Sequence, residues 1–157
     1  MNAEAQRKQL FNPEEANLRL PLVKAIVKDI VALYQNLHDR QARIEEIKRL
    51  PGSSTRDEDS VYSEELLQAE IDIENDKEQL KAYENELVEL GVELEDPAEG
   101  VVNFPALRND EEVCLCWKLG EDEVGYWHDI DEGFSERRSL LEESLNNEND
   151  DHNDLLM

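Results

Sequence analysis

The chain has 157 residues, with 16 Lys and Arg against 40 Asp and Glu, so its formal net charge is −24 when the three histidines are neutral. This charge excludes simple binding to nucleic acid or to an anionic membrane surface, because phosphate contacts need clustered cations. Only 39% of the residues are hydrophobic and 6% are aromatic. Such a composition is typical of long solvated helices.

The two ends of the chain indicate how it is organised. The opening MNAEAQRKQ lacks the apolar core of a secretory signal, and no apolar run approaches the roughly 20 residues of a membrane span. Residues 142–157 hold six acidic groups, four asparagines and no cation. We therefore expect a cytoplasmic protein with a single domain over residues 1–141, followed by an acidic disordered tail at 142–157.

A first helix is predicted over residues 13–50. Asn12 suits the N-cap, Pro13 suits the first helical position, and Glu15 completes a capping box. Pro21 has no N–H to donate to the preceding turn, so a kink or a restart is expected there. After Pro21 the apolar residues are spaced alternately by three and four, which indicates a coiled-coil seam.

A second helix is predicted over residues 62–90, and Gly91 follows it at the position where a capping glycine is common. It repeats the three-and-four spacing and follows a polar stretch that reads as a flexible loop. The two matched lengths predict a long antiparallel coiled-coil-like hairpin. Arg40 and Asp76 fall on seam positions of the two helices and are expected within reach of each other as a buried pair.

The apolar face of the hairpin is wide over residues 22–37 of the first helix and narrows to a bare seam over 38–75, at the tip of the hairpin. A wide face needs more than one partner helix. We call the end of the hairpin that carries this wide face its base, and we expect the carboxy-terminal module to pack there. We also expect a second copy of the chain to cover part of the same apolar face, giving a homo-oligomer, most simply a dimer.

Beyond Gly91 the hydrophobic period changes to two, and strands are predicted within residues 92–128. The predicted fold class is α+β, mainly α: the helical hairpin with a small C-terminal antiparallel β-element packed at its base. A turn at Gly120 pairs residues whose numbers sum to 241. This register puts Trp117 opposite Val124 and Val113 opposite His128.

The same register argues against a metal site made of Cys114, Cys116 and His128, because it points the histidine away from both thiols. We expect both cysteines to be reduced, buried and free of metal, and the chain to need no cofactor. A looser group remains as an alternative: His128 with the carboxylates of Asp129, Asp131 and Glu132 resembles a divalent-cation or small-molecule site.

Residues of the predicted base are candidates for binding a partner, since the chain is otherwise poor in aromatic side chains. By the predicted register Trp117 lies in the core, whereas Trp127 lies on the opposite face and is available for contact. The binding candidates are Phe104, Trp127, His128, Asp131 and Arg137.

Three stretches, EEANLRLP at 14–21, GVVNFPAL at 100–107 and EEVCLCWKLGEDEVGYWHDIDEGFSERRSL at 111–140, resemble a bacterial family known as domain of unknown function 2203. The chain departs from the family pattern at Asn103, in place of Asp, and at Glu136, in place of Gly. The resemblance implies a helical hairpin followed by a strand-rich segment, and it implies no activity. The matching positions are Pro21, Phe104, Pro105, Cys116, Trp117, Gly120, Glu121, Trp127, His128, Gly133, Phe134 and Arg137.

The sequence contains no nucleophile beside a base and no Gly-rich phosphate loop, so enzyme activity has no support from it. We expect a non-enzymatic, self-associating protein–protein interaction or scaffold module that binds itself and an unidentified protein partner. The alternative is a small-molecule or metal-dependent binding or catalytic site around His128. A third hypothesis is nucleic-acid mimicry by the second helix, which has ten acidic and two basic residues over 62–90.

Overall fold

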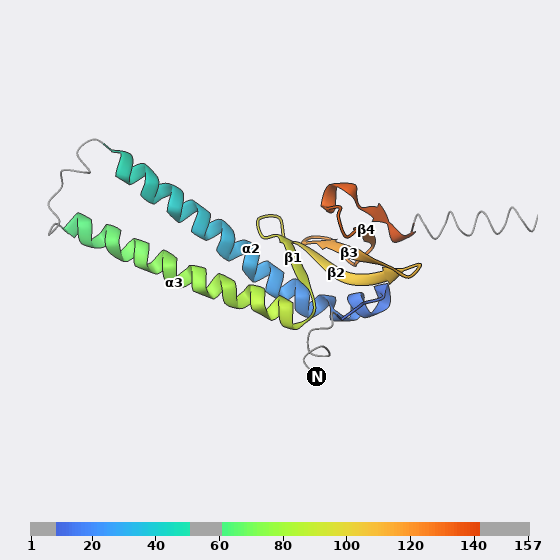
Figure 1. Cartoon of the computed structure of the whole chain (residues 1–157). Coiled ribbons are helices and arrows are strands. Elements are labelled where there is room, and N and C mark those ends of the chain that lie inside the picture. Colours follow the sequence, from blue (N-terminus) through green and yellow to red (C-terminus); the bar gives the residue numbers. More distant parts are fainter. Residues whose placement is uncertain (1–8, 51–60, 142–157) are drawn as a thin grey trace, which may run out of the picture.

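The computed structural model of the protein describes residues 9–50 and 61–141. It is an α+β fold, as expected, with two long helices beside one antiparallel sheet (Figure 1). The expected acidic tail and most of the expected polar loop lie outside the described residues. The elements are α2 (Pro13–Arg49), α3 (Val61–Glu89), β1 (Glu93–Asp96), β2 (Val101–Arg108), β3 (Glu111–Lys118), β4 (Tyr126–Asp129), the 3-10 turn η2 (Phe134–Glu136) and β5 (Arg138–Ser139).

The start of α2 follows the predicted capping box. The Glu15 amide donates to Asn12 Oδ1 at 2.8 Å, and the Asn12 amide donates to Glu15 Oε1 at 3.0 Å. Of the two expected effects of Pro21, a kink or a restart, the restart does not occur, because the helix is continuous through the proline. Leu20 and Val23, on either side of the proline, are both buried in the same core.

The end of α3 follows the predicted glycine cap. Gly91 has φ +83°, its amide donates to the Val88 carbonyl at 2.9 Å, and the Val92 amide donates to the Leu87 carbonyl at 2.9 Å. These two bonds form a Schellman motif, which satisfies carbonyls that the last turn would otherwise leave unpaired.

Helices α2 and α3 lie side by side and run in opposite directions (Figure 1). Arg40 is hydrogen-bonded to Asp76, as expected, and Lys48 Nζ lies 2.8 Å from Glu70 Oε2. The Arg40 and Asp76 side chains are 33% and 41% exposed, so the pair is not buried as expected. Partial exposure limits its contribution to stability to the range of surface pairs, about 0 to 1 kcal/mol.

The five strands form a meander in the order β1-β2-β3-β4-β5, with every neighbouring pair antiparallel. Strand β5 lies beyond the range in which strands were predicted. Phe11 adds a short bridge at the edge of β2, where its amide donates to the Pro105 carbonyl at 2.6 Å.

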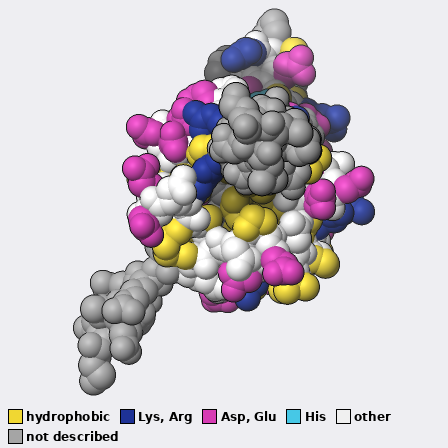
Figure 2. All heavy atoms as spheres, turned by 90° about the vertical axis from the view of Figure 1, so that its right-hand side faces the viewer, with side chains coloured by type: hydrophobic (Ala, Val, Ile, Leu, Met, Phe, Trp, Pro, Cys, Tyr) yellow, Lys and Arg dark blue, Asp and Glu magenta, His cyan; other side chains and the backbone are white. Residues whose placement is uncertain are grey.

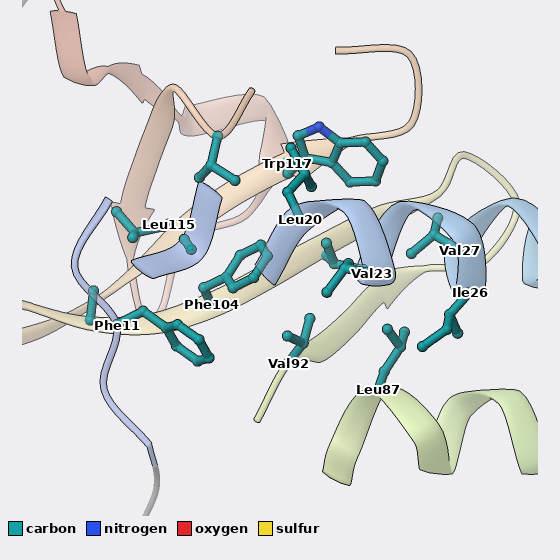
Figure 3. Close-up of a cluster of buried hydrophobic side chains, with 14 of the residues drawn as sticks. Phe11, Leu20, Val23, Ile26, Val27, Leu87, Val92, Phe104, Leu115 and Trp117 are labelled. Carbon is teal, nitrogen blue, oxygen red and sulfur yellow. The ribbon is translucent and has the colours of Figure 1, made fainter. Parts of the chain in front are cut away.

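One face of the sheet packs on α2 and on Phe11, which precedes that helix (Figure 3). This sheet face covers the wide apolar face of α2 within one chain, so a second copy is not required there. The expected packing of the carboxy-terminal module against the helices is confirmed. The buried side chains labelled in Figure 3 are Phe11, Leu20, Val23, Ile26, Val27, Leu87, Val92, Phe104, Leu115 and Trp117.

The predicted register between β3 and β4 is wrong by one residue. Cys114 pairs with His128 and Cys116 pairs with Tyr126, so the paired numbers sum to 242. Val124 does not pair with β3, because its backbone N–H and C=O are both bonded to Asn17 of α2. The shift moves every β4 side chain to the opposite face.

Within residues 9–50 and 61–141, neither helix combines the length and the apolar character that crossing a bilayer requires.

Candidate functional site

The face of the sheet that points away from α2 brings together three side chains capable of ligating a metal. They are Glu95 from β1, Cys116 from β3 and His128 from β4, and one donor atom of each lies within 4.8 Å of the other two. The corrected register makes this possible, because it puts His128 on the same sheet face as the cysteines.

His128 is the buried centre of this cluster, with 1% of its surface exposed. Its Nδ1 lies 2.8 Å from the Asp129 backbone carbonyl oxygen. Since a carbonyl oxygen only accepts, Nδ1 carries a proton. The other ring nitrogen, Nε2, lies 3.1 Å from Asn103 Oδ1 and 3.5 Å from Glu95 Oε1.

Glu95 is positioned by an irregularity in its strand. The pairing of β1 with β2 shifts between Leu94 and Asp96, which indicates a β-bulge at Glu95, and bulges re-aim side chains. Glu95 Oε1 accepts from Asn103 Nδ2 at 2.9 Å, and Oε2 accepts from the Phe134 amide at 2.9 Å. The two oxygen atoms of the Glu95 carboxylate are therefore held by residues of two different elements, β2 and η2.

Cys116 is fully buried, and burial raises the pKa of its thiol to about 12, against the opposing effect of the nearby Arg137 charge. Both cysteines are buried, as the sequence predicted, and neither is in a disulfide. A thiol with so high a pKa is a poor nucleophile at neutral pH, because the thiolate is the reactive form.

Arg137 closes one side of the cluster. Its guanidinium lies 3.9 Å from the Tyr126 ring centroid and 4.1 Å from that of Phe134, and it forms a two-pronged ion pair with Glu121. Burial opposes charge on both partners. The hydrogen bond and charge of Arg137 nevertheless lower the pKa of Glu121, and the same contact raises the pKa of Arg137.

The five predicted binding residues do not form one surface. Phe104 and Trp127 lie in the core between the sheet and the helices, whereas His128 and Arg137 lie on the outer side. Asp131 is exposed in the segment after β4. The base surface expected from the sequence is therefore divided between two faces of the sheet.

The expectation that Trp127 is an exposed anchor is wrong. Only 8% of it is exposed, and it belongs to the same buried cluster as Trp117. The guanidinium carbons of Arg108 and Arg138 lie 4.5 Å and 4.7 Å from the centre of its ring system. The register shift is the cause, since it turns Trp127 toward the side of Leu115.

The looser cation group expected around His128 is not assembled. Glu132 Oε1 accepts from the Asp129 amide at 3.0 Å, and its Oε2 pairs with Arg138 at 3.1 Å. The backbone hydrogen bond from Asp129 is the main reason that the pKa of Glu132 is lowered. The carboxylates of Asp129 and Glu132 therefore pair with Arg138, and the carboxylate that lies 3.5 Å from His128 Nε2 is that of Glu95.

Sequence reasoning missed Glu95 and Asn103 as partners of His128. Glu95 lies 33 residues before the histidine and is one of 40 acidic side chains. Its role follows from the bulge and from the meander order, neither of which has a local sequence signal.

The chain belongs to the family described as "Uncharacterized conserved protein (DUF2203)", whose model matches residues 9–140. This match confirms the family suggested by the sequence and spans both helices and all five strands. No curated protein and no solved structure matches the chain.

Proposed function

We propose that this protein is a non-enzymatic interaction module that self-associates through the ends of α2 and α3 far from the sheet. In this proposal the two helices act as a long antiparallel coiled-coil-like hairpin. The sheet stabilises one end, and the other end binds a second copy of the chain.

The observation that carries the proposal is an apolar groove between the helices, in the part that stands clear of the sheet (Figure 1). The groove has a volume of about 290 Å³. Apolar side chains of both helices line it: Ile44, Ile47, Leu66, Ala69 and Ile73.

The packing of this part of the molecule is sparse compared with the end that carries the sheet. Its buried side chains are Leu37, Ile44 and Ile73, which form a small cluster apart from the main core. Two helices alone bury only a narrow seam, and most helical stability in proteins comes from packing an amphipathic face on a partner. A second hairpin would convert the pair into a four-helix arrangement.

Charge favours a second copy as the occupant. Helix α2 has seven basic and six acidic residues, whereas α3 has ten acidic and two basic residues. Arg40 and Arg43 on one helix face Glu65 and Asp72 on the other across the groove. A two-fold dimer would set α2 of each copy beside α3 of its partner, so the opposite charges meet twice.

The exposed surface at the sheet end of the molecule is less suited to self-association than the groove between the helices. Acidic side chains are spread around the sheet end of the molecule, with exposed hydrophobic side chains between them (Figure 2). Such scattered exposed apolar residues are normal on a soluble protein.

Light scattering of the full chain over a range of concentrations tests the proposal. We expect a species of twice the 18.2 kDa chain mass. Ile47→Lys, which puts a charge into the groove, should shift the chain toward monomer. Leu18→Lys is the matched control, because Leu18 lies on the same helix, is 80% exposed and is outside the groove.

A monomer at every accessible concentration would refute the proposal. Equal dissociation by the two variants would place the contact elsewhere. Circular dichroism of both variants should show unchanged helix content, so that loss of the dimer is not confused with unfolding.

A further inference from the structure

We propose that Glu95, Cys116 and His128 bind a divalent transition-metal ion, with Zn²⁺ as the best match. The three residues come from β1, β3 and β4, so the ion would link three strands on the outer face of the sheet. The inference is independent of the proposed self-association, which concerns the other end of the helices.

The donor set selects the kind of ion. One sulfur, one imidazole nitrogen and one carboxylate oxygen suit a borderline-soft cation, and Zn²⁺ accepts all three in tetrahedral sites. Hard cations such as Ca²⁺ and Mg²⁺ prefer oxygen alone. The Nε2 of His128 and Oε1 of Glu95 are 3.5 Å apart, close to the separation of two ligands on one tetrahedral zinc ion.

The second ring nitrogen of His128, Nε2, faces two of the oxygen atoms that surround the cluster. Nδ1 donates its proton to the Asp129 carbonyl, which fixes the orientation of the ring. Nε2 then faces two oxygen atoms, Asn103 Oδ1 and Glu95 Oε1. A metal ion bound to Nε2 would accept the nitrogen lone pair and attract both oxygen atoms.

The groups around the donors match the supporting shell of a metal site. Metal-bound histidines commonly donate the other ring N–H to a backbone carbonyl, and ligating carboxylates are themselves hydrogen-bonded. His128 and Glu95 satisfy both conditions, through Asp129 and through the Phe134 amide. The Asn103 amide oxygen, or a water molecule, completes the fourth position.

Cys116 gives metal binding a spectroscopic signature. Binding of Zn²⁺ forms a Zn–S bond, breaks the S–H bond and releases the proton to solvent. A spectroscopic signal from a metal–thiolate bond would therefore report an ion bound at Cys116.

The test uses the full chain after treatment with a chelator. Co²⁺ is added as an optical probe, and Zn²⁺ is then used to displace it. We expect one ion per chain, a thiolate-to-cobalt charge-transfer band, and a rise in melting temperature with Zn²⁺. Cys116→Ser should remove the band, and Glu95→Gln should weaken binding at least about tenfold.

Two variants control for the other thiol and for non-specific binding to acidic side chains. Cys114→Ser alters the second thiol on the same sheet face, and Asp131→Asn alters an exposed carboxylate three residues after His128 in the sequence. Both should bind cobalt as the unmodified chain does.

The proposal is overturned if Co²⁺ gives no thiolate band, or if Zn²⁺ does not change the melting temperature. It is also overturned if Glu95→Gln, a change at a partly exposed side chain, binds both ions as tightly as Asp131→Asn does.

Discussion

Asn17 on α2 holds the backbone of Val124 by two hydrogen bonds that run in opposite directions. The Val124 amide donates to Asn17 Oδ1 at 2.7 Å, and Asn17 Nδ2 donates to the Val124 carbonyl at 3.3 Å. The side chain thus replaces the strand partner that Val124 lacks. It fixes the segment before β4 on the helix and sets the register of the strand that carries His128.

Asn17→Ala should therefore destabilise the protein by about 1 to 3 kcal/mol, because it leaves the backbone groups of the buried Val124 unpaired. Asn17→Asp keeps the acceptor for the amide and should cost less. Urea denaturation of the two variants checks this order. Equal loss in both, or no loss in either, would show that the contact does not position the strand.

The two tryptophans should contribute similarly to stability. Trp117 and Trp127 are both buried in the core, so replacement of either by Ala should cost about 3 to 5 kcal/mol. In variants that keep one tryptophan each, fluorescence should be blue-shifted and shielded from a soluble quencher. An accessible Trp127 would contradict the observed register.

Replacement by Phe should separate the two positions. Trp117 Nε1 donates to the Glu121 carbonyl at 3.0 Å, whereas no described residue accepts from Trp127 Nε1. Trp117→Phe should therefore cost about 1 kcal/mol more than Trp127→Phe. Thermal melts of the two variants side by side measure the difference.

Acid should weaken the protein partly through Glu121. Burial opposes ionisation of this carboxyl, but hydrogen bonds from Arg137 and from the Lys118 amide lower its pKa below the usual value of about 4.3. The contribution of ionised Glu121 to the free energy of unfolding is complete above the pKa that this carboxyl has in the unfolded chain. It is lost as the pH falls through the lower pKa that the carboxyl has in the folded protein.

Glu121→Gln should cost about 1 to 3 kcal/mol at pH 7 and progressively less below about pH 4.3. Denaturation at several pH values, with chelator present, gives the difference between the two proteins. A difference that stays constant down to pH 3 would show that the Arg137 pair does not stabilise the fold.

Local signals in the sequence were sufficient to predict the start of α2 and the end of α3. Asn12 and Gly91 act through hydrogen bonds within a few residues, so their roles can be read from adjacent sequence. The contact between Arg40 and Asp76 was also predictable, because both lie on a periodic seam.

The site was not predictable in this way. Its geometry depends on Asn17, which displaces Val124 from the strand pairing although 107 residues separate the two in the sequence. A one-residue change in register reversed the faces of His128 and Trp127. The register on which the sequence argument separated His128 from the two cysteines was wrong for the same reason.

Two glycines allow backbone strain to be separated from packing. Gly100 and Gly120 both have positive φ, at +73° and +108°, where an L-residue costs about 1 to 2 kcal/mol. A Cβ at Gly100 would lie 2.8 Å from Leu119 Cβ and 3.0 Å from Val31 Cγ2, whereas a Cβ at Gly120 would meet nothing within 4 Å.

Gly120→Ala should therefore show the cost of strain alone, about 1 to 2 kcal/mol. Gly100→Ala should cost about 1 to 3 kcal/mol more, because overpacking forces the sheet away from α2 where Val31 and Leu119 meet the core. Chemical denaturation of both variants gives the two values. An equal loss of unfolding free energy in the two variants would mean that the contact between Gly100 and α2 adjusts to a Cβ without an energetic cost. The sheet would then be held on α2 mainly by the side chains around Phe104 and Trp117.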